Sequence, residues 1–214
     1  MSEQTSVAGS LPAADRLIEI VAVLLLGLTT IGTAWCGYQA AQWNGLSGDH
    51  ARASAEQHVD GARLYGAATQ RVSYDSQIVA QYAEAKSAGN TRLLRFYRAS
   101  LMRPDFLPTL DRWEAEVDAG RLPTGLTEDQ AYVTAQLADY RAAVASASAS
   151  TAASQEAGQS ADAYVATTIL LAAALFFAGV TSSFRYRPAR VLLLLAAIGT
   201  VAVAASRLAG LPLG

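Results

Sequence analysis

Residues 17–39 read LIEIVAVLLLGLTTIGTAWCGYQ, and this stretch decides the fold class of the chain. At a helical rise of about 1.5 Å per residue, it is long enough to cross a hydrocarbon core of about 30 Å. Two further apolar runs follow towards the C-terminus, at residues 164–184 and 191–210. The sequence therefore predicts three transmembrane helices, with the lipid bilayer as the first partner of the protein.

The overall composition agrees with a membrane protein. Of the 214 residues, 52% are hydrophobic and 16% are charged, against about 25% charged residues in an average soluble domain. The formal net charge of −2 gives no support to nucleic acid as a partner. Cys36 is the single cysteine, so no intramolecular disulfide can form and helix packing has to hold the extramembrane region together.

The distribution of arginine predicts the orientation of the spans, because short loops rich in Arg and Lys stay in the cytoplasm. Four arginines lie on the same predicted side: Arg16, Arg185, Arg187 and Arg190. We therefore expect a cytoplasmic N-terminal tail (1–16) and a cytoplasmic hairpin (185–190). The region 40–163 and the C-terminal tail (211–214) then lie outside the cytoplasm.

The region 40–163 contains two long helical patterns. Small or apolar residues recur at 3–4 spacing in the first pattern, at Tyr65, Ala68, Val72, Asp75, Val79 and Tyr82. The second pattern begins at about Glu128, with Val133, Leu137, Tyr140, Val144, Ala147 and Thr151 at matching positions. Such heptad spacing is typical of coiled-coil packing. We predict an all-α protein with a long antiparallel helical hairpin domain between the first and second transmembrane helices.

Local signals subdivide this hairpin. Gly89 is a candidate C-cap for the first long helix, and residues 44–48 are the place for any kink. Two shorter helices should follow, at residues 91–102 and at about 105–117, and residues 118–127 read as a loop. We expect the two short helices to close the far end of the hairpin.

The sequence offers no catalytic, cofactor or metal motif. His50 and His58 are the only histidines, and their spacing is not a recognised metal-ligand pattern. No Ser or Cys nucleophile is placed near either histidine by a motif. We therefore expect no cofactor, no metal site and no enzymatic activity.

Polar residues in and beyond the first span allow two interpretations. Thr30, Thr33 and Gln39 could line a pore if first helices gathered around the axis of a homo-oligomer. Otherwise their side chains make hydrogen bonds between helices.

A stripe of basic residues lies on the first short helix. Arg92, Arg95 and Arg98 follow at i, i+3 and i+6, and they could contact an anionic lipid headgroup. The next helix is acidic, however, with Asp105, Asp111, Glu114, Glu116 and Asp118. Salt bridges between the two helices are the interpretation that we favour.

Three stretches carry a resemblance to a known family. They are residues 34–43 (AWCGYQAAQW), residues 96–98 (FYR) with 103–106 (RPDF), and residues 162–165 (DAYV) through 175–179 (LFFAG). The chain resembles an uncharacterised family of bacterial three-span membrane proteins with a helical extracytoplasmic domain. The resemblance implies a topology in the bacterial cytoplasmic membrane and implies no activity. The segment 118–130 is shorter here than the Pro-rich insert of that family.

The function that these features favour is a non-enzymatic, homo-oligomeric scaffold or accessory subunit of a membrane complex. The Ala-rich segment 142–163 would let another helix approach closely. One alternative is an oligomeric channel lined by the first span. Another is a lipid-binding membrane protein or enzyme that uses the stripe from Arg92 to Arg103.

Overall fold

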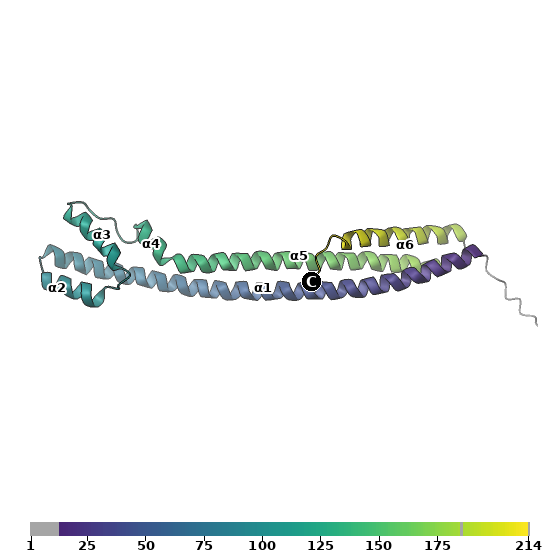
Figure 1. Ribbon diagram of the computed structural model, residues 1–214, viewed down its shortest axis with the longest axis horizontal. Helices are drawn as coiled ribbons and strands as arrows, with labels where there is room; N and C mark the ends of the chain where they lie inside the picture. The colour runs from purple at the N-terminus through teal and green to yellow at the C-terminus, as the bar shows by residue number, and fades with distance from the viewer. Residues whose placement is uncertain (1–12, 185, 214) are drawn as a thin grey trace, which may run out of the picture. The chain divides into compact units, whose positions relative to one another are not determined.

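The computed structural model describes residues 13–184 and 186–213, with side chains from Arg16 onwards. Over these residues the protein is all-α, as predicted, and Figure 1 shows the order of its helices. The elements are α1 (Ala13–Ser87), α2 (Thr91–Phe96), a π-helical turn η1 (Tyr97–Leu101), α3 (Leu107–Asp118), α4 (Gln130–Gln136), α5 (Ala138–Thr181) and α6 (Arg187–Leu208). Arg185, part of the predicted cytoplasmic hairpin, lies outside the described residues.

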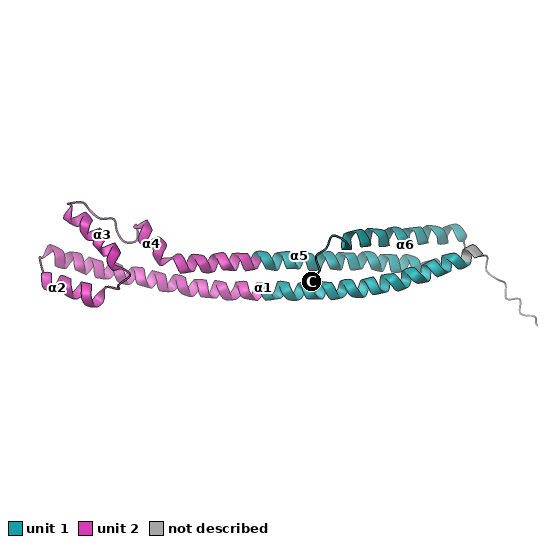
Figure 2. Ribbon diagram, in the orientation of Figure 1, with its two compact units in different colours: residues 1–51, 152–214 teal, residues 52–151 magenta. Residues whose placement is uncertain are grey.

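The chain divides into two compact units (Figure 2). Unit 1 comprises Met1–Ala51 and Ala152–Gly214, and unit 2 comprises Arg52–Thr151. Helices α1 and α5 each contribute residues to both units. Helix α6 belongs to unit 1, whereas α2, α3 and α4 belong to unit 2.

Unit 1 holds the apolar helical segments. Three helices, α1, α5 and α6, each contain a window that is long and apolar enough to cross a membrane. Small side chains let these segments approach closely, as expected where lipid replaces water and hydrophobic burial no longer drives packing. Gly32 is one such position, because a Cβ built there would lie 3.3 Å from a methyl group of Leu171. The structure thus confirms three candidate spans.

Hydroxyl groups tie α1 to α5 at the end of unit 1 that follows the first span. Ser47 Oγ donates to the carbonyl of Ser154 at 2.8 Å, and Ser154 Oγ donates back to the carbonyl of Ser47 at 2.9 Å. Gly158 lies next to this pair, with its ideal Cβ 3.5 Å from Ser47 Oγ. The reciprocal bonds require the two helix backbones to lie close together.

In unit 2, α1 and α5 form the predicted antiparallel hairpin. Buried α1 positions recur every seven residues, at Ser54, Gly61, Ala68, Asp75 and Tyr82. Ser54 Oγ lies 2.8 Å from Thr151 Oγ1, and Ser150 Oγ donates to Gln57 Oε1 at 3.0 Å. A strict seven-residue repeat is the pattern of two α-helices that wind around each other in a left-handed supercoil.

The edge of this helix pair differs in one detail from the predicted pattern. Tyr65, placed by sequence in the contact face, is 51% exposed. Its ring packs beside Tyr140 with centroids 5.2 Å apart, while Gly61 occupies the buried position. A Cβ at Gly61 would lie 3.7 Å from the Cβ of Ala143, so the backbone of α1 approaches α5 too closely for a large side chain.

A cap of short helices covers the other end of the unit 2 hairpin (Figure 1). Its apolar core contains Ile78, Val79, Tyr82, Met102, Phe106, Leu110, Leu126 and Tyr132. Gly89 ends α1 with φ +65°, and the amide of Asn90 donates to the carbonyl of Ala85. This left-handed C-cap confirms the predicted stop.

The second helical stretch begins at Gln130, near the predicted start at about Glu128, but it is not one continuous helix. Asp129 caps α4 by accepting from the amide of Tyr132 at 3.0 Å. The helix is then interrupted at Leu137, with φ −95° and ψ 6°, before α5 starts. The interruption lets the two helices pack against different neighbours: α4 places Tyr132 in the cap core, whereas α5 pairs with α1.

Candidate functional site

The cap of unit 2 is organised around a buried carboxylate, Asp75, which is 1% exposed. Tyr132 Oη donates to it at 2.6 Å from α4. Arg103, in the connection before α3, donates to it through Nη2 at 2.6 Å and Nε at 3.3 Å. Asp105 accepts from another arginine nitrogen, Nη1, at 2.8 Å. One carboxylate on α1 therefore fixes two other segments of the cap.

A second polar cluster lies at Glu114 on α3. Tyr82 Oη donates to Glu114 Oε1 at 2.5 Å, and Arg98 Nη1 donates to Oε2 at 3.0 Å. Arg98 also pairs with Asp111, and Lys86 pairs with Asp118 at 2.9 Å. The cluster joins α1, η1 and α3 through charged hydrogen bonds.

These environments shift the proton affinities of the groups involved. Burial raises the pKa of Tyr82 to about 12, and the adjacent Glu114 carboxylate adds to the shift. The pKa of Tyr132 is raised by burial and by its bond to Asp75. The bond to Asp75 also raises the pKa of Arg103. Both tyrosines therefore stay neutral donors at physiological pH, and Arg103 stays charged.

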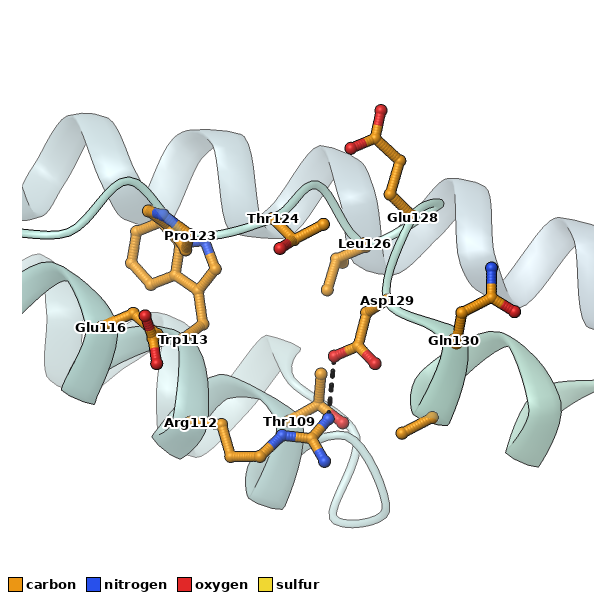
Figure 3. Close-up of a pocket in the computed structure, with 11 residues that line it drawn as sticks. Thr109, Arg112, Trp113, Glu116, Pro123, Thr124, Leu126, Glu128, Asp129 and Gln130 are labelled. Carbon is orange, nitrogen blue, oxygen red and sulfur yellow. Dashed lines mark hydrogen bonds and ion pairs between the residues drawn. The ribbon is translucent and has the colours of Figure 1, made fainter.

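A pocket of about 410 Å³ lies between α3 and the loop that leads into α4 (Figure 3). Its polar lining includes Arg112, Glu128 and Asp129, and Trp113 contributes an aromatic wall. Arg112 Nη2 pairs with Asp129 Oδ2 at 2.9 Å across this space. The pocket is small and acidic on balance, which suits a basic side chain of a partner better than an anion.

The same loop presents an unusual apolar side chain. Leu122 is 98% exposed, and Pro123, the next residue, lines the pocket. Glu116 at the pocket wall pairs with Arg121, with Arg121 Nε 2.6 Å from Glu116 Oε2. The hydrogen bond from Arg121 lowers the pKa of Glu116. Leu122 is therefore an exposed apolar side chain that lies next in sequence to a residue of the pocket wall.

The basic stripe predicted from sequence is divided by the structure. Arg98 pairs with Asp111 and Glu114, as the salt-bridge interpretation expected. Arg92 and Arg95 are exposed, and Arg95 Nε reaches only the carbonyl of Thr91 at 3.4 Å. Contact with anionic lipid therefore remains a prediction for Arg92 and Arg95, whereas Arg98 is already engaged.

The three residues predicted as pore-lining do not share one face of α1. Thr30 is exposed and Gln39 is buried, as expected for residues nine positions apart, which point to opposite sides of a helix. The hydroxyls of Thr30 and Thr33 donate to carbonyls of their own helix, at Leu26 and Thr29. The pore interpretation stays a prediction, and one axis can face Thr30 or Gln39 but not both.

Sequence reasoning missed Asp75 and Tyr132 as partners in the cap. Asp75 was recognised only as a member of the heptad pattern. A carboxylate at a position otherwise filled by small and apolar residues was the available signal, since a buried charge needs a partner. Its partners lie 28 and 57 residues away, so spacing alone could not identify them.

Among the residues that the structure describes, no group of three or more His, Cys, Asp or Glu side chains could hold a metal ion. Comparisons with protein families, curated proteins and solved structures gave no match. The three long apolar helices that the family resemblance implies are present, and membership of that family remains a prediction.

Proposed function

We propose that this chain is a non-enzymatic, homo-oligomeric scaffold or accessory subunit of a membrane complex. The observation that carries the proposal is that buried and half-buried charged side chains in unit 2 pair with one another within the chain. The polar network at Asp75 and the cluster at Glu114 pair their charges within the chain and fix the cap. A cap held in one arrangement loses less conformational entropy when a partner binds, which favours a binding role.

Self-association is supported by the outer faces of the hairpin. Exposed alanines on α5 recur at 4-3-4 spacing, at Ala138, Ala142, Ala145 and Ala149. The exposed face of α1 carries Ala55, Ala62 and Gly66. Both rows lie away from the face that pairs α1 with α5, so each could receive a helix of another copy.

The proposed location is the bacterial cytoplasmic membrane, with the N-terminus inside and unit 2 outside the cytoplasm. The family resemblance supports the bacterial origin. The positive-inside rule supports the orientation through Arg16, Arg187 and Arg190. Trp35 and Tyr38 at the end of the first span are suited to the interface between lipid and water.

Photo-crosslinking in intact membranes tests the scaffold directly. A photoreactive residue at Ala145 should give an adduct at twice the monomer mass, and one at Leu122 should give a defined adduct with a different protein. The matched control is Val23, an exposed position within the first apolar window, which should give neither product. A native mass equal to one chain, with no protein adduct from Ala145 or Leu122, would refute the proposal.

A further inference from the structure

Unit 1 contains an apolar groove among α1, α5 and α6. It has a volume of about 320 Å³ and is lined by Leu28, Thr29, Ile31, Gly32, Trp35, Leu171, Val201, Ala205 and Leu208. We propose that this groove binds one acyl chain of a bilayer phospholipid, with the lipid headgroup at Tyr38. The proposal rests on the membrane-spanning helices and is independent of the scaffold function.

The wall of the groove has almost no polar atoms that could form hydrogen bonds with water. Apart from the indole of Trp35, its polar side chain is Thr29, whose hydroxyl donates to the carbonyl of Leu25 at 2.5 Å. Leu28 and Ile31 are 62% and 70% exposed, so the groove opens outwards. An apolar hollow of this kind stays dry or takes an apolar occupant. Within a bilayer the available occupant is an alkyl chain.

Beyond the Trp35 end of the groove, the next turn of α1 carries a polar side chain, Tyr38, and this feature favours a lipid with a headgroup. From Leu28 to Trp35 the groove extends about 10 Å along α1, at about 1.5 Å per residue. Tyr38 follows one turn after Trp35 and is 59% exposed. Its hydroxyl accepts from Gln42 Nε2 at 2.7 Å, and its own proton is available to an oxygen of the headgroup. An apolar groove that leads to a hydroxyl donor matches a molecule with one apolar and one polar end.

Two alanines on α6 provide a matched test. Ala205 lines the groove, whereas Ala202 is exposed on the same helix outside it. Ala205→Leu should fill the groove, and Ala202→Leu adds the same side chain elsewhere. The full-length protein is delipidated in detergent, titrated with dipalmitoyl phosphatidylethanolamine or dipalmitoyl phosphatidylglycerol, and examined by native mass spectrometry.

The wild-type protein and Ala202→Leu should each retain one phospholipid, and Ala205→Leu should bind it at least tenfold more weakly. Tyr38→Phe should weaken phospholipid binding severalfold but leave binding of hexadecane, which has no oxygen to accept a hydrogen bond, unchanged. Equal retention by Ala205→Leu and Ala202→Leu would overturn the proposal. So would a change from dimer to monomer in Ala205→Leu without loss of lipid, because the groove would then hold a second copy of the chain.

Discussion

Replacement of Asp75 by asparagine tests whether the buried network holds the cap of unit 2 together. The substitution keeps the size of the side chain and removes its charge. Arg103 then loses its buried partner, although its side chain is 25% exposed and keeps Asp105 at 2.8 Å. Tyr132 can still donate to the amide oxygen of the new residue, so the change acts chiefly on the arginine.

The size of the effect follows from burial. Removing one partner of a fully buried ion pair costs about 3–5 kcal/mol. Because Arg103 retains some solvent and Asp105, we expect a loss of about 2–4 kcal/mol in the free energy of unfolding of the cap. The matched control is Asp60→Asn, also on α1, whose pair with Arg63 is 64% and 77% exposed. Exposed pairs of this kind contribute about 0.5 kcal/mol or less.

Hydrogen exchange of the full-length protein, followed by mass spectrometry, measures this loss locally. At 1.4 kcal/mol per factor of ten, amides of α4 should exchange about 30- to 700-fold faster in Asp75→Asn. They should be nearly unchanged in Asp60→Asn. The apolar triple variant Asp75→Leu, Arg103→Met and Tyr132→Phe should recover much of the protection, because no charge is left buried. Equal exchange in Asp75→Asn and Asp60→Asn would refute the reasoning.

Three further predictions concern the pH response and the glycines of the hairpin. Because the folded pKa of Tyr82, about 12, exceeds the unfolded value of about 10, its contribution is complete below pH 10 and is lost between pH 10 and 12. Circular dichroism melts should show a steeper alkaline loss of stability in the wild type than in Tyr82→Phe, by up to about 1.4 kcal/mol per pH unit; parallel losses would contradict this. Gly61→Leu should destabilise the hairpin by about 1–3 kcal/mol through overpacking, while Gly66→Leu, with nothing within 4 Å of its ideal Cβ, should be neutral or stabilising; the reverse order in the same melts would exclude the contact at Gly61. Gly89→Ala should cost about 1 kcal/mol because φ is +65° there, and an unchanged melting temperature would show that the C-cap does not limit stability.

The elements that sequence could predict are those determined by local patterns. The apolar runs predict the spans, the seven-residue spacing predicts the hairpin face, and Gly89 predicts the end of α1. The interruption at Leu137 arises instead because α4 packs against the cap core whereas α5 packs against α1, and a local sequence pattern does not show this. The pocket beside Trp113 and the groove beside Gly32 depend on distances between helices, which a heptad pattern does not specify.

The two ends of the unit 2 hairpin are held by different kinds of packing. Towards Ser54 the contact face consists of small and hydroxyl-bearing side chains, and a buried alanine methyl contributes only about 0.8 kcal/mol. The cap instead buries Phe106 and Leu110, which contribute about 1.5–3 kcal/mol each. The stability of the unit is therefore concentrated in the cap. Because the Asp75 network lies in the cap, changes to it should have the largest effect on the free energy of unfolding of unit 2. A partner that binds near Leu122 would act on this part of unit 2, so the exchange rates of the cap amides offer a way to detect its binding.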